Sequence, residues 1–195
     1  MEYHVDGFDE PTAFRAGTSL LVTGPSGQLD GQILDVVTPR EGERAVAITT
    51  NLGASTVLEE FRARGASADQ VGVIDCTGAE GGSLDCPVGR VHSPGDLTGI
   101  SLEFAKQLDD VDESVPVRVG LASVSTVLMY AELRTVFRFL HVFTARIRSG
   151  EMFGAFAMDP SMHDDKANNT LRAVFDCQAE VAGPEVALTG SGFER

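Results

Sequence analysis

The sequence has little positive charge and almost no lysine. Lys106 and Lys166 are its only lysines, and arginine supplies the rest of the 15 basic side chains among 195 residues. They stand against 29 acidic side chains, which gives a formal net charge of −14. Such an acidic chain repels the phosphates of nucleic acids and of anionic membranes. The composition therefore disfavours nucleic acid as a partner and predicts a cytoplasmic protein of a salt-loving organism.

Long apolar runs and paired cysteines are also lacking. No apolar stretch approaches the roughly 20 residues that cross a bilayer, and the acidic N-terminus lacks the basic and apolar regions of a signal peptide. We therefore expect no membrane insertion. The three cysteines, Cys76, Cys86 and Cys177, are an odd and sparse set that is typical of reduced thiols. The spacing of Cys76, Cys86 and His92 matches no zinc pattern, so buried structural thiols are expected.

Strands and helices alternate along the chain. Continuous apolar strands predict a buried, mostly parallel sheet covered by helices on both faces. The length suits one domain, residues 1–195. Strands are expected at 19–23, 45–50, 71–75, 115–121 and 152–158, a terminal strand pair at 173–181 and 185–188, and helices at 31–37, 55–64, 96–108 and 132–148. Ser55 is expected to cap the second of these helices, and residues 77–90 are expected to form a mobile loop.

The first strand leads into LLVTGPSGQLDG, residues 20–31, which has the frame of a phosphate-binding loop without its chemistry. The motif is an apolar strand, G-x-x-x-x-G-K-[ST] and a helix. Gly24 stands at the first glycine, but Asp30 stands at the lysine position and Gly31 at the hydroxyl position. An aspartate there repels a polyphosphate. The degenerate loop comprises Gly24, Pro25, Ser26, Gly27, Asp30 and Gly31.

The order of motifs resembles a known family. The loop GPSGQ, the segments NLGASTVLEEFRARG and VHSPGDLTGISLEF, and the tract from Gly120 to Val181 are similar to RecA-like ATPases of the KaiC type, in their haloarchaeal form. The resemblance covers roughly residues 15–190. It implies a three-layer fold with a central parallel sheet, and ATP bound between neighbouring subunits of a ring or filament.

Two further motifs of that family are altered. The family ends its fourth strand in Asp-Ser, which positions magnesium and water, whereas this chain has Ala122 and Ser123. The family places catalytic glutamates after the second strand, whereas this chain has no carboxylate there until Glu59. Together with the altered phosphate loop, these departures predict that the chain does not hydrolyse ATP. Neither ATP, magnesium nor another metal is expected as a cofactor.

Other candidate chemistry is weaker. A catalytic triad could be written from Ser123, His141 and Asp159, but nothing in their spacing supports it. The segment DPSMHDD could hold a divalent ion through Asp159, His163, Asp164 and Asp165. The alternative, which we favour, is a capped loop before a helix, with Pro160 fixing the turn.

The helix at 132–148 carries a basic stripe. Arg134, Arg138, His141 and Arg148 recur at i, i+4, i+7 and i+14, within about an 80° arc. The stripe is either a solvated face or a docking face for an acidic protein partner or a neighbouring subunit. Phe139, Val142 and Phe143 widen the apolar surface beyond one face. A helix that is apolar over more than one face must bury the second, which predicts a homo-oligomer.

Three functions remain open. A regulatory or protein-interaction (scaffold) module on a catalytically inactive fold agrees with an intact core and lost catalytic residues. The alternative is a nucleotide-binding sensor or residual ATPase of the KaiC type. The third is a DNA-associated RecA-like protein.

Overall fold

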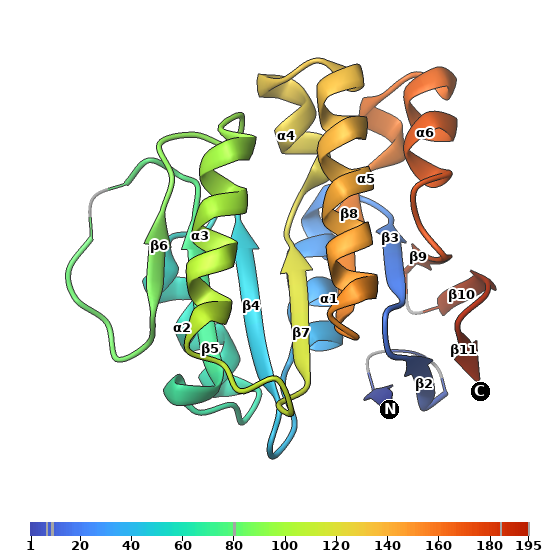
Figure 1. Ribbon diagram of the computed structural model, residues 1–195. Helices are drawn as coiled ribbons and strands as arrows, with labels where there is room; N and C mark the ends of the chain where they lie inside the picture. The colour runs from blue at the N-terminus through green and yellow to red at the C-terminus, as the bar shows by residue number, and fades with distance from the viewer. Residues whose placement is uncertain (7, 9, 80, 184, 195) are drawn as a thin grey trace.

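The computed structural model describes residues 1–6, 8, 10–79, 81–183 and 185–194. It has three layers: a central sheet with α3 and α5 in front of it and α1 and α2 behind it (Figure 1). This confirms the predicted three-layer α/β fold. The helices are α1 (Ser26–Val37), α2 (Ala54–Ala63), α3 (Leu97–Asp109), α4 (Val124–Tyr130), α5 (Leu133–Ser149) and α6 (Asp165–Arg172), with 3-10 turns at Ala68–Gln70 and Pro160–Met162.

The central sheet has eight strands in the order β10-β9-β3-β8-β7-β4-β5-β6. All neighbours pair parallel except β10 and β9, which form the predicted C-terminal antiparallel pair. The strands are β3 (Ser19–Thr23), β4 (Arg44–Thr49), β5 (Val71–Asp75), β6 (Val88–Arg90), β7 (Val117–Leu121), β8 (Phe153–Met158), β9 (Cys177–Ala182) and β10 (Glu185–Gly190).

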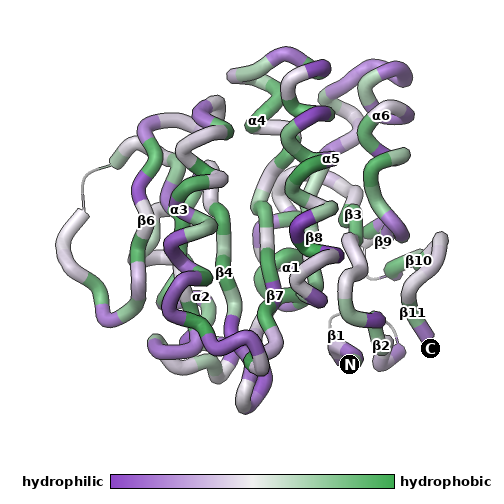
Figure 2. The backbone as a smooth tube through the Cα atoms, viewed as in Figure 1, coloured by the Kyte–Doolittle hydropathy of each residue, from purple (hydrophilic) through white to green (hydrophobic). Residues whose placement is uncertain are grey.

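Both faces of this sheet are buried. Every residue of β3, β5, β7 and β8 is buried, which explains their continuous apolar sequences. The central strands β4 and β7 are hydrophobic along most of their length (Figure 2). One core packs α1 and α2 on the first face, and a second core packs α3, α4, α5 and α6 on the other. No helix in the described part of the chain is long and apolar enough to cross a membrane.

A small antiparallel sheet packs beside the amino-terminal ends of the central strands β7 and β8. It contains β1 (Glu2–Val5), β2 (Thr12–Arg15) and β11 (Phe193–Glu194) in the order β1-β2-β11, and none of these strands was predicted. The buried Tyr3 hydroxyl donates to the Glu151 carbonyl at 2.9 Å and accepts from the Val117 N–H at 3.2 Å. Burial raises the pKa of Tyr3 to about 12. The first strand is therefore part of the packed core.

Several predicted boundaries are wrong. The first helix begins at Ser26, five residues before the predicted start at Gly31. Ser55 does not cap α2; Gly53 is the N-cap residue, and the Asp75 carboxylate accepts from the Ala54 N–H at 2.9 Å. The expected loop at 77–90 includes β6, and α4 was not predicted.

Candidate functional site

The candidate site lies at the carboxyl edge of the sheet, where β3 joins α1. Only Gly24 and Pro25 separate the strand from the helix. Gly24 is tightly packed, because a Cβ added there would lie 3.0 Å from the Val181 carbonyl oxygen. Ser26, Gly27, Asp30 and Gly31, predicted as loop residues, lie in the first turns of α1. The wide loop of backbone N–H groups that surrounds a phosphate in a P-loop is therefore replaced by a direct strand-to-helix turn.

A carboxylate of the chain itself occupies the N-terminus of α1. Asp159 follows β8, and its side chain accepts from the Ser26 N–H at 2.9 Å and the Ser26 hydroxyl at 2.7 Å. It also accepts from the N–H and hydroxyl of Ser161, at 3.0 and 2.6 Å. Asp159 is only 8% exposed. A helix N-terminus attracts anions through its unpaired N–H groups and its dipole, and Asp159 supplies that anion internally.

The same contacts keep Asp159 ionised. The hydrogen bond from the Ser161 hydroxyl, followed by those from Ser26, lowers the pKa of Asp159 to about 2, although burial opposes this. At neutral pH the carboxylate is fully charged. A second anion, such as a phosphate group, would meet a like charge there, and both donors of Ser26 are already bound to Asp159.

Two positions that the resemblance implies to be altered lie near each other. Asp30 and Ala122 line one small cavity of about 20 Å³ beneath α1, together with Gly120 and apolar side chains. The Asp30 carboxylate accepts from the Asn51 amide at 2.7 Å, which links α1 to the segment after β4. The cavity has room for about one water molecule. The position that holds a lysine in a P-loop therefore carries an acid paired with a neighbouring amide.

The triad that could be written from the sequence, and that its spacing did not support, is not formed among these residues. Ser123 is the N-cap of α4, where its hydroxyl accepts from the Thr126 N–H at 3.0 Å. His141 lies exposed on α5 and stacks on Phe137, with ring centroids 6.1 Å apart. Neither side chain has a hydrogen bond to Asp159 among those of the described residues, so the three are separate structural elements.

A different serine and histidine meet beside Asp159. The buried Ser125 hydroxyl lies 2.8 Å from Nε2 of His163 and accepts from the Asp159 N–H at 3.0 Å. Burial lowers the pKa of His163, while the charges of Asp159 and Asp164 oppose the shift. Ser125 is 1% exposed, which makes it inaccessible as a nucleophile. The pair fixes the segment after β8 against α4, and sequence spacing gave no sign of it.

The acidic segment 159–165 is a capped loop, as favoured from the sequence. Asp159 caps the turn that contains Pro160, and Asp164 caps α6 by accepting from the Ala167 N–H at 2.7 Å. The described residues bring together no three acidic, histidine or cysteine side chains in a metal-binding arrangement. These carboxylates are therefore used as helix caps.

The basic stripe on α5 is only partly available at the surface. Arg134, Arg138 and His141 are exposed, whereas Arg148 forms an ion pair with Asp176 at 2.6 Å. Among the apolar residues assigned to a second face, Val142 is 65% exposed and Phe139 is half-buried.

The prediction that Phe143 belongs to an exposed apolar surface is wrong. Phe143 is 3% exposed, and its ring lies 4.7 Å from the ring of Phe104 and 6.1 Å from that of Phe156. It fills the core between α5, α3 and strand β8 of the sheet. Of the three residues assigned to the second apolar face of α5, Phe143 is therefore buried within the domain, Phe139 is half-buried and Val142 is exposed.

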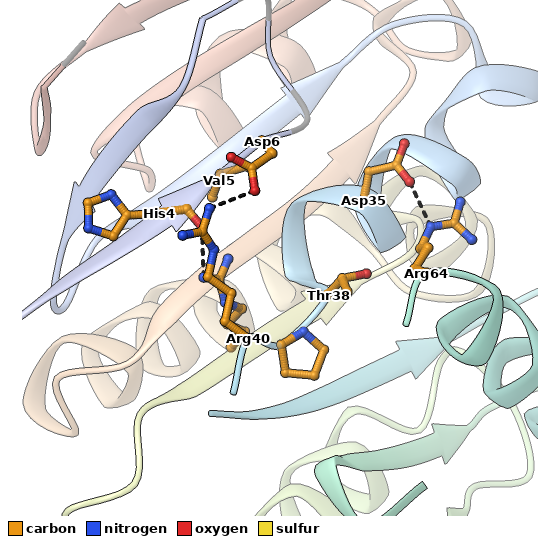
Figure 3. A pocket seen from close by; sticks show the side chains of 9 residues that line it. His4, Val5, Asp6, Asp35, Thr38, Arg40 and Arg64 are labelled. Atoms are coloured by element: carbon orange, nitrogen blue, oxygen red, sulfur yellow. Dashed lines mark hydrogen bonds and ion pairs between the residues drawn. The ribbon is translucent and has the colours of Figure 1, made fainter. Parts of the chain in front are cut away.

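A larger cavity lies at the opposite edge of the sheet (Figure 3). It has a volume of about 450 Å³. Its arginines are already paired: Arg40 with Asp6 and Arg64 with Asp35, both at 2.6 Å. The buried Arg118 guanidinium binds Glu43 at 2.6 Å through Nε. These carboxylates neutralise the arginines that line the cavity, so the cavity does not indicate a charged ligand.

Comparisons with known proteins agree with this fold. Residues 17–181 match the family described as "Family of unknown function (DUF7504)". No curated protein matches the sequence. A protein of Pyrococcus horikoshii OT3 from a structural project superposes with a TM-score of 0.61 at 15% identity, covering 91% of this chain and 88% of that chain. A KaiC-like protein of the same hyperthermophilic archaeon gives 0.58 at 11% identity, covering 90% and 77%. These similarities show a RecA/KaiC-like fold.

Proposed function

This chain belongs to the DUF7504 family, and we propose that it is a catalytically inactive RecA/KaiC-like domain that acts as a regulatory or protein-interaction (scaffold) module. The observation that carries the proposal is the Asp159 carboxylate at the N-terminus of α1. It accepts four hydrogen bonds from Ser26 and Ser161, all between 2.6 and 3.0 Å. Ser26, the first residue of α1, therefore gives both of its donors to a carboxylate of the chain itself.

The surroundings of Asp159 support the same proposal. Phosphoryl transfer needs a phosphate cradle, a cation against the transferred group and a carboxylate for magnesium. In this chain α1 begins two residues after β3, Asp30 is bound to Asn51, and Ala122 stands where the resemblance places the magnesium carboxylate. Each change removes a different part of the reaction.

The proposal is tested by turnover of ATP and GTP with magnesium in molar potassium chloride. We expect release of phosphate at the rate of the buffer alone. The matched variant is Gly27→Glu, because a Cβ at Gly27 meets no atom within 4 Å and the added carboxylate would repel a phosphate. Turnover by the wild type that is lost in Gly27→Glu would contradict the proposal.

The alternative is a nucleotide-binding sensor or residual ATPase. One observation favours it: the donors of Ser26 and Ser161 are directed at the two oxygens of one carboxylate, and they would suit the oxygens of a phosphate if Asp159 moved away. A rise in melting temperature with magnesium and ATP, without turnover, would support the sensor. A DNA-associated role is the least favoured, because the net charge of −14 opposes contact with a phosphate backbone.

We further propose that the protein works in the cytoplasm of a salt-loving archaeon. The support is the acidic, lysine-poor composition, because salt screens the repulsion among 29 carboxylates. The expected result is a urea midpoint that rises from dilute buffer to molar potassium chloride. A midpoint that stays flat or falls would contradict this assignment.

Self-association remains a prediction. It rests on the resemblance to ring- and filament-forming ATPases, because the burial of Phe143 removes much of the apolar face from which it was also argued. Light scattering over a wide concentration range in molar salt tests it, and a strictly monomeric mass would contradict it.

A further inference from the structure

The consecutive helices α4 and α5 both carry exposed side chains that bury nothing within the domain, and these include apolar residues and arginines. They lie at the end of α4 and along the first three turns of α5, and α4 ends near the carboxyl edge of the sheet (Figure 1). We call this set of side chains the α4–α5 surface and define it by Met129, Tyr130, Arg134, Arg138 and Val142. Met129, Tyr130 and Val142 are 69%, 60% and 65% exposed, which places them among the most exposed large apolar side chains in the described chain.

The arginines of this surface belong to the six described arginines without an ion pair, and the other four are Arg15, Arg44, Arg146 and Arg172. Within the described residues, ion pairs involve Arg40, Arg62, Arg64, Arg90, Lys106, Arg118 and Arg148. Arg134 and Arg138 form no ion pair with any described residue, although the chain has about twice as many acidic as basic side chains. Further along α5, the Arg146 guanidinium lies 5.1 Å from the centroid of the Phe104 ring, so this arginine already has a contact within the domain.

We propose that the α4–α5 surface docks an acidic amphipathic helix of a partner protein. This rests on the proposed function and names the chemistry of its partner. Arg134 and Arg138 are four residues apart on one helix face, so their Cβ atoms are about 6 Å apart. That spacing matches two carboxylates four residues apart on a facing helix, and each guanidinium can bind a carboxylate through two parallel hydrogen bonds.

The apolar residues of the surface explain how a partner can stay bound at high salt concentration. Ion pairs between exposed groups are weak, and salt screens them further. Met129, Tyr130 and Val142 offer apolar area whose burial salt does not weaken. Methionine adapts its shape to a partner, and tyrosine adds a rigid ring with a polar end. The partner must therefore carry apolar residues beside its carboxylates, which is the pattern of an amphipathic helix.

The charge of the whole chain distinguishes this partner from a nucleic acid. Two arginines and three apolar side chains offer a phosphate backbone few contacts, and the net charge of −14 repels its many phosphates. A short acidic helix brings fewer charges and presents its carboxylates only to the arginines. The surface is therefore matched to a local acidic segment.

The probe is a synthetic, fluorescently labelled amphipathic helix with glutamates four residues apart beside a leucine stripe. Binding is followed by anisotropy in dilute and in molar potassium chloride. We expect the double variant Arg134→Glu/Arg138→Glu to bind about tenfold more weakly than the wild type, because two attractive contacts become repulsive. The matched control is Arg15→Glu/Arg172→Glu, which makes the same charge change at exposed arginines outside the surface. We expect the control to bind like the wild type.

Other outcomes would overturn the docking proposal. Equal weakening in both double variants would indicate a general charge effect, and equal binding of a lysine version of the peptide would indicate apolar adhesion. Preferential binding of a single-stranded oligonucleotide would assign the surface to nucleic acid. A wild-type dimer that Arg134→Glu/Arg138→Glu dissociates would assign it to a second copy of this chain. None of these results bears on ATP turnover, so failure of the docking surface is distinct from failure of the proposed function.

A second measurement locates the contact. Hydrogen exchange with the bound peptide is expected to slow in α4 and the first half of α5 and to stay unchanged in α1 and α2. Val142→Ser is expected to weaken binding in molar salt as well as in dilute buffer, because it removes apolar contact and not charge. Protection elsewhere, with α4 and α5 unaffected, would contradict the proposal.

Discussion

The N-termini of α1 and α2 are built in the same way, although only the first resembles a phosphate site in sequence. Each helix follows a strand of the parallel sheet, and each N-terminus binds a carboxylate from a different strand end. Asp159 accepts from the Ser26 N–H, and Asp75 accepts from the Ala54 N–H, both at 2.9 Å. The comparison indicates that Asp159 caps the N-terminus of α1 in the same way as Asp75 caps that of α2.

The two caps differ in how their charge is stabilised. The Asp75 side chain is 2% exposed and lies 3.7 Å from the Arg90 guanidinium. Burial raises its pKa, but hydrogen bonds from Thr77 and Ala54 and the charge of Arg90 outweigh this and hold the pKa below its usual range. Asp159 has no ion pair with any described residue and depends on hydroxyl and amide donors alone. Asp75 is thus the more deeply buried of the two caps, and it is the one that has an ion pair.

Asp75→Ala is expected to have the largest effect on stability. It leaves the Ala54 N–H and the Thr77 donors without their acceptor and Arg90 without its partner. We expect a loss of about 3 kcal/mol in the free energy of unfolding, measured by urea denaturation. Glu59→Ala, an exposed acid on α2, is the control and is expected to change stability little. A loss below about 1 kcal/mol for Asp75→Ala would contradict the capping role that is assigned to Asp75.

Asp159→Ala is expected to cost less, about 2 kcal/mol, because its donors lie nearer to solvent and water can replace the carboxylate. It should also create an anion site. Sulfate or inorganic phosphate is expected to raise the melting temperature of Asp159→Ala more than that of the wild type, compared with chloride at equal ionic strength. An equal rise in both proteins would contradict the account of Asp159 as an internal anion.

The pH dependence of stability provides a smaller effect. The pKa of Asp159 is about 2 in the folded chain, below its usual range, so its contribution is present above the unfolded value. That contribution is lost as the pH falls from about 4 toward 2. Asp159→Asn keeps the shape of the side chain and removes this proton uptake. We expect its urea midpoint to fall less steeply over that range than the midpoint of the wild type. Parallel curves would contradict the assigned pKa.

Local sequence patterns predicted the layers of the fold well. Continuous apolar runs such as Phe153–Met158 fit only strands buried on both faces, and the spacing within Leu133–Ser149 fits a helix on that sheet. The short strands β1, β2 and β11 were missed because they carry few apolar residues and depend on one another across the length of the chain. Gly27 is interpreted from the sequence as a loop glycine, but it lies in the first turn of α1, and Gly31, the expected start of that helix, lies inside it.

The caps could not be predicted, because their partners are distant in sequence. Asp159 reaches Ser26 across 133 residues, and Asp75 reaches Ala54 across 21. Nothing in the sequence near Ser26 indicates which acid will meet it. The same holds for Ser125 and His163, which meet only because α4 and the segment after β8 lie at neighbouring strand ends. The resemblance implies which P-loop residues are replaced, and the structure places the Asp159 carboxylate against Ser26 at the N-terminus of α1.

The central claim is that Asp159 leaves the N-terminus of α1 no capacity for a phosphate group. The most direct measurement is calorimetric titration of the wild-type protein with ATP and magnesium in molar potassium chloride. The account predicts no saturable heat of binding up to millimolar nucleotide. Saturable binding in the micromolar range, lost in Gly27→Glu and retained in Glu59→Ala, would contradict it.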